Sequence, residues 1–327
     1  SLARLQERSR RMINRRNLLA GGSGVGGSLL LKRQSSAQES STPGSILYVR
    51  SGDIWRWSGG KEDKLIADGS VGDPRWSPDG SQVLYVRSGN SYSDLYIRTI
   101  SSGSDFQLTF NQPVAFDAGS KDYADNSVWA IDPSWAATGL IGYASDYYTP
   151  YGRLCLWLID GPGNDPILAA ANNVDQGVEN ICLSSDGSVA AFTSRYADQD
   201  TAEYVSYVAI QDLASGDAYP LVDDAGGSFY PSFDPNGKRV AVAIRAGDKC
   251  DIWIIDRSGG ARVRVTENAQ AINPSFASNG SWIAYFRMVD YRFEVWASPV
   301  NGDQVGEPVK LFAYDDLDPS SGISWRM

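Results

Sequence analysis

A short pattern of a proline, an aromatic residue and a tight turn recurs along the chain and constrains its fold more than any other feature. Repetition of one unit indicates a solenoid, a propeller or an array, because each unit buries its apolar face against a neighbour. The clearest copies occupy residues 73–80 (DPRWSPDG), 230–237 (YPSFDPNG) and 273–280 (NPSFASNG). Looser copies occupy 132–139 and 180–187, and a shortened copy occupies 323–327 (ISWRM).

The residues after each copy predict four short strands per unit. Asp-Gly or Asn-Gly between two apolar runs is a strong hairpin signal, because both residues tolerate positive φ. The turn glycines are spaced 43 to 59 residues apart, and blades of four-stranded propellers have about this length. The expected strands include 83–86, 94–98 and 106–110, then 239–244, 251–255 and 262–266, and finally 282–287, 293–297 and 309–312.

The two ends of the repeat region complement each other. The first unit, 46–67, has three strands and lacks an opening strand, whereas 323–325 is an opening strand without a unit. Closing a ring removes exposed sheet edges, which otherwise pair with other chains. We therefore predict an all-β, six-bladed propeller over residues 43–327, with four-stranded blades and with the C-terminal strand completing the first blade. An open array or two separate sheets is the alternative.

The order of these motifs resembles the propeller of the TolB-like, WD-type family. The shared features are Pro-x-Trp-Ser-Pro-Asp-Gly, an apolar strand, Asp-Leu-Tyr and a Leu-Thr strand. The match is nearly complete at 74–80 and weakest at 181–187, where Leu183 replaces the aromatic residue. The resemblance implies a six-bladed propeller that acts as an interaction platform. It concerns the propeller part only, and we expect no counterpart of the family's N-terminal α/β domain.

Charge and residue types restrict the function. Residues 1–40 hold eight of the 29 basic and two of the 39 acidic residues, which leaves a net charge of −16 on the remainder. Phosphate backbones repel such a domain, so we expect no nucleic-acid partner. The chain contains no histidine, which excludes Ser-His-Asp and Cys-His mechanisms. Its three cysteines cannot all pair. The sequence leaves two possibilities, a Cys155–Cys182 disulfide or three free thiols.

Residues 1–42 have the character of an export signal and a linker. Arg15 and Arg16 precede an apolar, glycine-rich stretch to Leu31, followed by a small-residue site at 35–37. A basic region, an apolar core and a small-x-small end describe a signal peptide, and the twin arginines resemble a Tat-type address. The apolar run is too short to span a bilayer, so we expect no stable membrane span. The prediction is a periplasmic or extracellular monomer, with an uncleaved anchor or a basic tail as alternatives.

We expect one face of the ring to carry function. Loops between second and third strands and links between blades share this face, and the expected long loops are 88–93, 111–129, 144–152, 195–203 and 288–292. They are rich in Asp and Tyr, and Tyr offers rigid apolar area with a polar tip. The alternative is that each tyrosine packs on its own blade. The candidate ligand-binding residues are Asp117, Asp122, Tyr123, Asp146, Tyr147, Tyr148, Tyr151, Tyr196, Asp198, Tyr230 and Tyr291.

The residues that open each inner strand should surround the mouth of the central channel. The candidates there are Asp73, Arg75, Asp132, Asn180 and Asn273. Carboxylate and amide oxygens suit Ca²⁺, so Asp73 and Asp132 are candidate calcium ligands, although no cofactor is required. The alternative is that Asp or Asn before Pro caps a turn by bonding to backbone N–H groups. Small residues further in, such as Ser134 and Ser232, let the inner strands approach the axis.

Two classes of function remain from the sequence. The first is a non-enzymatic binding or scaffold propeller that presents its acidic, Tyr-rich loops to a protein, peptide or glycan. The second is a carbohydrate-active enzyme, a glycoside hydrolase or lyase, because two loop carboxylates suffice for glycoside hydrolysis without histidine. Asp117, Asp122, Asp146 and Asp198 are its candidate carboxylates, and nothing in their spacing selects a pair.

Overall fold

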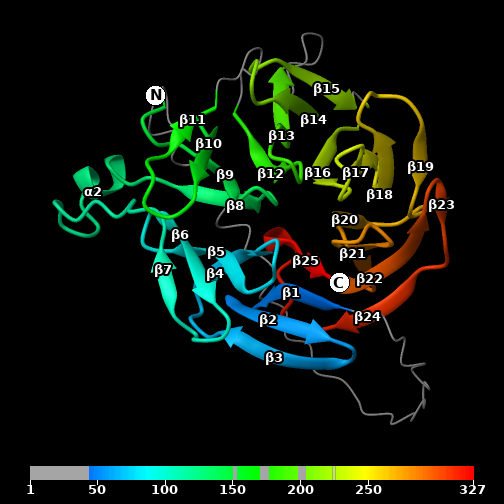
Figure 1. The fold of residues 1–327 in the computed structure, drawn as a ribbon, viewed down its shortest axis with the longest axis horizontal. Helices are drawn as coiled ribbons and strands as arrows, with labels where there is room; N and C mark the ends of the chain where they lie inside the picture. Colours follow the sequence, from blue (N-terminus) through cyan, green and yellow to red (C-terminus); the bar gives the residue numbers. More distant parts are fainter. Residues whose placement is uncertain (1–43, 150–152, 170–176, 198–203, 223, 225) are drawn as a thin grey trace.

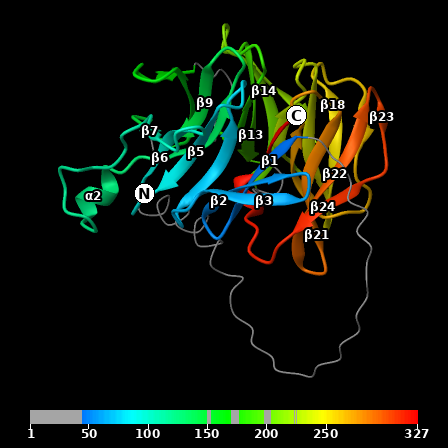
Figure 2. The same cartoon turned by 60° about the horizontal axis from the view of Figure 1, so that its bottom comes forward.

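The chain folds into six antiparallel sheets arranged as the blades of a closed propeller (Figure 1). The computed structural model describes residues 44–149, 153–169, 177–197, 204–222, 224 and 226–327. Blades follow one another around the ring in sequence order, and Figures 1 and 2 both show blade 1 beside blade 6. The prediction of six four-stranded blades is therefore confirmed.

The strands of each blade are given from the channel outwards. Blade 1 contains β25 (Ser324–Arg326), β1 (Ser45–Arg50), β2 (Asp53–Ser58) and β3 (Lys61–Ile66). Blade 2 contains β4 (Val71–Trp76), β5 (Gln82–Ser88), β6 (Ser93–Thr99) and β7 (Asp105–Gln107). Blade 3 contains β8 (Ala130–Trp135), β9 (Leu140–Ser145), β10 (Cys155–Asp160) and β11 (Ile167–Leu168).

The second half of the ring has the same plan with one addition. Blade 4 contains β12 (Glu179–Leu183), β13 (Val189–Ala197), β14 (Tyr204–Asp212) and β15 (Ala218–Val222). Blade 5 contains β16 (Ser228–Phe233), β17 (Arg239–Ala246), β18 (Lys249–Asp256) and β19 (Arg262–Arg264). Blade 6 contains β20 (Ala271–Phe276), β21 (Trp282–Val289), β22 (Arg292–Asn301) and β24 (Val309–Ala313), and a short β23 (Gln304–Val305) extends the end of β22.

The ring closes as the sequence predicts. Strand β25 pairs with β1, so that Trp325 lies opposite Ile46 and Ser324 opposite Leu47. The Trp325 side chain is 4% exposed in the apolar cluster between blades 6 and 1, and its ring centroid lies 6.2 Å from that of Trp282. The two ends of the repeat region are thus held in one sheet and one core.

A second contact fastens the same closure from the link between β24 and β25. The Arg50 guanidinium donates to an Asp316 carboxylate oxygen at 2.9 Å, and the Ser51 hydroxyl donates to the other oxygen at 2.8 Å. The Asp318 N–H donates to the Val49 carbonyl at 3.0 Å. Blade 1 is therefore tied to this link through its second strand as well as through β25.

The core is divided between neighbouring blades. Within the described residues, six clusters of buried apolar side chains each combine side chains from two adjacent blades. Alternating strand residues face opposite sides of a blade, so each sheet contributes to two clusters. This arrangement explains why one unit cannot be stable alone.

No helix among the described residues is long and apolar enough to cross a membrane.

The recurring pattern has a backbone cause. Register shifts interrupt the pairing of inner and second strands, and in each of these shifts the residue before Pro or its equivalent has positive φ. Asp and Asn tolerate this region better than most residues, whereas Tyr230 at φ 55° is costly. The affected residues are Asp73, Asp132, Asn180, Tyr230 and Asn273, and Gly322 has φ 71° ahead of β25.

Small polar residues two positions further connect adjacent blades. Each accepts a hydrogen bond from a backbone N–H of the innermost strand of the next blade, whose inner edge has no further strand to pair with. Their small size was expected only to let the inner strands approach the channel axis, and these hydrogen bonds are an additional role. The pairs are Ser324 with Trp76 at 3.0 Å, Ser134 with Leu183 at 2.9 Å, Cys182 with Phe233 at 3.4 Å and Ser232 with Phe276 at 3.2 Å.

The Asp-Leu-Tyr and Leu-Thr motifs are joined within a blade. In blade 2, the Thr109 hydroxyl donates to Asp94 at 3.0 Å and accepts from the Leu95 N–H at 2.9 Å. In blade 5, Thr266 makes the same pair of bonds with Asp251 at 2.8 Å and with the Ile252 N–H at 3.0 Å. The motif thus fixes the outer strand rather than a ligand.

Candidate functional site

The two faces of the ring differ in their loops. One face carries the tight turns that follow the inner strands, such as 77–81 and 234–238. The other, here called the long-loop face, carries the blade links and the loops between second and third strands. The expected loop at 288–292 is instead a two-residue turn of Asp290 and Tyr291, both with positive φ, because β21 and β22 extend to residues 289 and 292.

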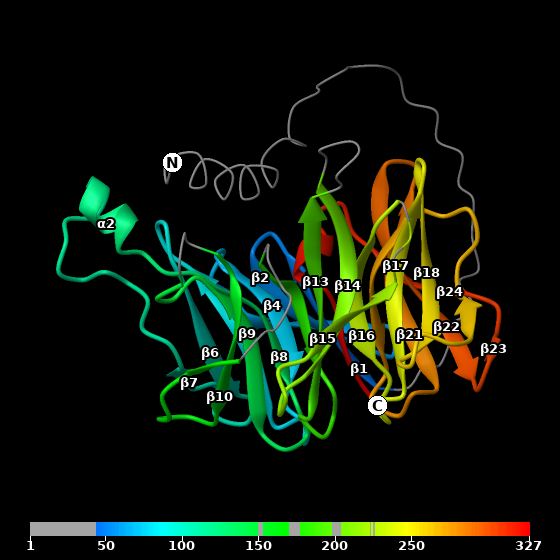
Figure 3. The ribbon, with the colours of Figure 1, turned by 90° about the horizontal axis from the view of Figure 1, so that it is seen from above.

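The most prominent feature of the long-loop face is a projecting segment, residues 110–128, between blades 2 and 3. It includes the short helix α2 (Lys121–Asp125), and Figure 3 shows this helix standing to one side of the blades. The Ser120 hydroxyl caps α2 by accepting the Tyr123 N–H at 3.0 Å. The Tyr123 side chain is buried, so this predicted ligand residue anchors the segment instead.

Both ends of the projecting segment are fixed to the start of β6. At the first end, the Asn111 N–H donates to Asp94 at 2.7 Å and its amide donates to the Ser93 carbonyl at 2.8 Å. At the other end, the Ser93 N–H donates to the Val128 carbonyl at 3.2 Å. Burial raises the pKa of Asp94 despite bonds from Asn111 and Thr109. The segment therefore leaves and rejoins the body at one point.

Apolar side chains of the projecting segment face solvent. Phe110 is 78% exposed and Val114 is 81% exposed, and Phe116 is also exposed. Asp117 and Asp122, both predicted ligand residues, are exposed on the same segment. Exposed apolar groups beside charged ones are typical of interaction surfaces. The sequence drew attention to the acidic residues here, whereas Phe110 and Val114 were missed.

The loop after β9 contributes one further exposed aromatic residue. Tyr148 is 88% exposed, and its ring meets that of Tyr147 edge-on at 4.5 Å. Tyr147 in turn packs on Trp157 at 5.2 Å. Asp146 accepts the Trp129 N–H at 2.8 Å, and burial raises the pKa of its carboxyl group. Tyr147 and Asp146 thus support the loop, and Tyr148 is the member presented to solvent.

Of the remaining predicted face residues, the structure places the side chains of two, Tyr230 in blade 5 and Tyr291 in blade 6. Tyr151 and Asp198 lie outside the described residues, and Tyr196 belongs to strand β13. Tyr291 is 98% exposed in the β21–β22 turn of blade 6. Tyr230 is half-buried in β16 of blade 5.

The channel-mouth residues bond mainly to backbone. An Asp132 carboxylate oxygen accepts the Asn180 N–H at 2.8 Å, and the Asn273 amide donates to the Pro319 carbonyl at 3.0 Å. The Arg75 guanidinium donates to the carbonyls of Pro74 at 2.9 Å and Ser321 at 3.4 Å. The Asp132 bond crosses from blade 3 to blade 4 and does not cap a local turn, so the turn-capping interpretation stays a prediction.

Calcium coordination at Asp73 and Asp132 stays a prediction without further support. Asp73 is 7% exposed, so little of its carboxylate reaches solvent. Within the described residues, no group of three or more acidic, cysteine or histidine side chains is arranged to hold a metal ion. Ca²⁺ requires about six to eight oxygen ligands, which two carboxylates do not supply.

One titratable residue at the mouth escaped the sequence analysis. Burial raises the pKa of Glu179, Asp132 adds to this effect, and Arg195, with Nη2 3.0 Å from the carboxylate, opposes it. Burial raises the pKa of Tyr230 to about 12, helped by Asp132 and Glu179. Glu179 precedes its copy of the repeat by one residue, so the repeat pattern did not include it.

The cysteines are separate. Cys155, Cys182 and Cys250 are all free thiols, so the structure contains no Cys155–Cys182 disulfide. Burial raises the pKa of Cys155 and of Cys182, which makes both weak nucleophiles.

The blades and their loops define a six-bladed β-propeller with tight turns on one face and longer loops on the other. No protein-family model matches the chain. TolB from Acinetobacter baumannii has the same fold, with a TM-score of 0.65 and 17% identity over 87% of this chain and 67% of that one. A protein assigned as TolB from Agrobacterium tumefaciens gives a TM-score of 0.58 and 18% identity over 84% and 91% of the two chains.

A third similar structure comes from a different setting. A chain in the crystal structure of a nidogen–laminin complex has a TM-score of 0.59 and 10% identity, over 86% of this chain and 98% of that one. These likenesses confirm the TolB-like resemblance at the level of the fold. Propellers of one architecture serve many activities, so function has to be argued from the site.

Proposed function

We propose that this propeller is a non-enzymatic binding platform whose projecting segment docks on a protein partner. The observation that carries the proposal is the exposure of Phe110 and Val114 on a segment whose stem is fixed by hydrogen bonds. A side chain held in water by a rigid stem is available for burial in a partner without a large ordering cost.

Charge indicates the character of the partner. Asp117 and Asp122 follow the apolar residues on the same segment, and the domain as a whole is strongly acidic. Complementary charges around an apolar centre favour encounter and exclude wrong partners. The expected partner therefore offers an apolar pocket surrounded by Lys or Arg. The nidogen–laminin structure supports this class of function, since a propeller of this fold occurs there in a protein complex.

A site-specific crosslinking experiment tests the proposal. A photo-reactive amino acid at position 110 should capture one protein in cells that produce this chain, and the same group at position 238, on the tight-turn face, should not. The captured protein is then purified, and its affinity for wild type and for Phe110→Ser with Val114→Ser is compared. We expect at least tenfold weaker binding by the double variant and unchanged binding by Lys238→Gln.

The alternative function, a carbohydrate-active enzyme, predicts a different experimental result. It requires turnover of a glycan by wild type, with loss of activity in Asp117→Asn, Asp122→Asn or Asp146→Asn. Turnover that depends on one of these carboxylates would replace the binding proposal. Equal crosslinking from both faces would also contradict it.

Export by a Tat-type signal completes the proposed function. Arg15 and Arg16 lie outside the described residues, so this part rests on the sequence pattern. A reporter that follows residues 1–42 should reach the periplasm, and Arg15→Lys with Arg16→Lys should retain it in the cytoplasm. Export that is indifferent to this pair would contradict the Tat assignment.

A further inference from the structure

A second, separate site lies on the long-loop face between blades 5 and 6. A cavity of about 190 Å³ opens there, away from the projecting segment of blades 2 and 3. Drug-sized ligands occupy pockets of roughly 300–1,000 Å³, so this cavity has room for one side chain or a group of that size. Its size therefore limits an occupant to about one residue.

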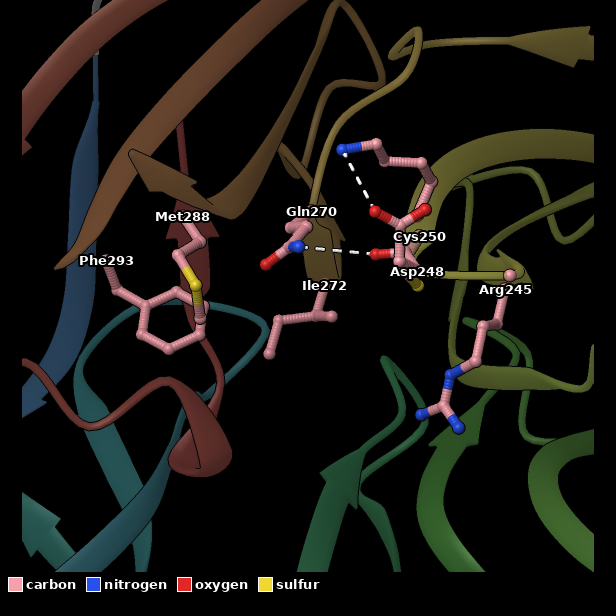
Figure 4. Close-up of a pocket in the computed structure, with 9 residues that line it drawn as sticks. Arg245, Asp248, Cys250, Gln270, Ile272, Met288 and Phe293 are labelled. Atoms are coloured by element: carbon pink, nitrogen blue, oxygen red, sulfur yellow. Dashed lines mark hydrogen bonds and ion pairs between the residues drawn. The ribbon is translucent and has the colours of Figure 1, made fainter. Parts of the chain in front are cut away.

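The inner wall of the cavity is apolar. Figure 4 shows Met288 and Phe293 on one side, with Ile272 between them and the cationic side. Phe293 is held edge-on against Phe286, with ring centroids 6.4 Å apart. Burial raises the pKa of the neighbouring Cys250 thiol to about 11, so this wall residue stays uncharged at neutral pH.

The opposite side of the cavity is cationic. The Arg245 guanidinium lies over the Phe229 ring, 4.9 Å from its centroid, and within the described part of the chain it forms no ion pair. Lys249 is already 3.5 Å from the Asp248 carboxylate. Arg245 is thus a surplus positive charge beside an apolar cavity, in a domain that is otherwise strongly acidic.

Backbone hydrogen bonds hold the walls in place. The Cys250 N–H donates to Ala269 O at 3.0 Å, and the Met288 N–H donates to Gln270 O at 2.9 Å. The Gln270 amide also donates to Asp248 O at 3.2 Å, a bond drawn in Figure 4. The link before β20 therefore joins blades 5 and 6 around the cavity, so the site exists before a ligand arrives.

We propose that this cavity binds the C-terminal residue of a peptide that ends in an apolar side chain. A terminal residue carries its carboxylate and its side chain on the same Cα, so both reach a cavity of this size together. The side chain would pack on Met288 and Phe293, and the carboxylate would face the planar donor fork of Arg245, which suits carboxylates. An Asp or Glu within a peptide lacks this combination, because its carboxylate is its side chain and no apolar side chain shares the same Cα.

Three fluorescein-labelled peptides test the proposal with the full chain. The first is Gly-Ser-Gly-Ser-Gly-Phe with a free carboxylate, the second is its C-terminal amide, and the third ends in Gly instead of Phe. Fluorescence anisotropy should show at least tenfold tighter binding of the first than of the other two. Equal affinity for acid and amide, or no binding of the first at millimolar protein, would overturn the proposal.

Variants locate the site. Arg245→Gln should weaken the free-acid peptide at least tenfold and leave the amide unchanged, whereas Lys238→Gln, which removes the same charge from the tight-turn face, should alter neither. Met288→Trp fills the cavity without changing charge and should abolish binding of both Phe peptides. Wild-type affinity in Met288→Trp would refute the location. Arg245→Gln and Met288→Trp both lie outside residues 110–128. The peptide experiment can therefore refute this proposal without refuting the proposed function of the projecting segment, and the reverse also holds.

Discussion

The hydroxyl group of Ser93 forms two hydrogen bonds with Ala130, donating to its carbonyl oxygen at 2.8 Å and accepting from its N–H at 3.0 Å. Thirty-seven residues separate the two along the chain. The pairing connects the start of β6 to the start of β8 and closes the base of the projecting segment. Ser93 is fully buried, so water cannot replace either bond.

Removing this hydroxyl should loosen the projecting segment. Ser93→Ala leaves a buried N–H and a buried C=O of Ala130 without this partner, which costs about 1–3 kcal/mol per unsatisfied group. We expect a lower free energy of unfolding in urea and faster amide exchange across residues 111–129. Ser102→Ala, in an exposed turn of the same blade, should change neither. Unaltered exchange in Ser93→Ala would show that the stem does not depend on this contact.

The closing strand should contribute strongly to stability. Trp325→Ala removes a buried aromatic side chain between blades 6 and 1 and should lower the free energy of unfolding by about 3–5 kcal/mol. Tyr291→Ala removes an aromatic side chain that is almost fully exposed, so its effect should stay within about 0.5 kcal/mol. Deleting residues 324–327 should in addition expose the edge of β1 and cause self-association, visible by size-exclusion chromatography. A monomeric deletion variant of wild-type stability would contradict this role.

Two turn carboxylates should make stability depend on pH. Asp79 accepts from the Ser77 hydroxyl at 2.7 Å and from the Ser81 N–H at 2.9 Å, and these bonds lower its pKa to about 2. Bonds from Ser184 and Ser188 likewise lower the pKa of Asp186 to about 2. Because the folded pKa lies below the unfolded value of about 3.9, the contribution is present above about pH 4 and disappears as the pH falls through 2.

Blade 6 provides the control for this pH dependence. Asn279 occupies the position of Asp79 and accepts the Ser281 N–H at 3.0 Å without a titratable group. Asp79→Asn with Asp186→Asn should therefore keep the turns folded and flatten the fall in melting temperature between pH 4 and pH 2. An unchanged pH profile would mean that other carboxylates dominate acid unfolding.

Cys182 should be replaceable by serine but not by valine. Its sulfur accepts the Phe233 N–H at 3.4 Å. The Ser134 and Ser232 hydroxyls accept the corresponding N–H groups of blades 4 and 6. Cys182→Ser keeps an acceptor and should change the free energy of unfolding by less than about 1 kcal/mol, whereas Cys182→Val leaves the N–H unpaired at about 1–3 kcal/mol. Urea unfolding under reducing conditions distinguishes the two, and equal stability would remove the sulfur from the inter-blade bonding.

Most of the fold could be predicted because local chemistry repeats. The Asp-Gly and Asn-Gly turns, the residues with positive φ and the Asp-Thr pairs each fix a feature of one blade with residues close in sequence. Closure of the ring by β25 could also be predicted from the sequence, because the first unit lacked a strand and residues 323–325 formed a strand without a unit. Strand β23 was missed, because it forms a two-residue extension of a hairpin with little apolar signal.

The site was less predictable because exposure depends on distant neighbours. Tyr123 and Tyr148 look alike in sequence, yet the Tyr123 side chain is buried and the Tyr148 side chain faces solvent. The raised pKa of Glu179 requires burial and a neighbouring Asp132 from another blade. The cavity beside Arg245 combines residues from β17, β18, β20, β21 and β22, and no stretch of the chain contains its pattern.

Completion of blade 1 by β25 also imposes an order on biosynthesis. Until residue 326 has left the ribosome, the first sheet lacks its innermost strand, and the backbone groups at the edge of β1 have no partner. Through this interval we expect the open edge of β1 to be the place where mispairing with another chain can begin. Closure of the ring is therefore expected only after the sixth blade has been synthesised.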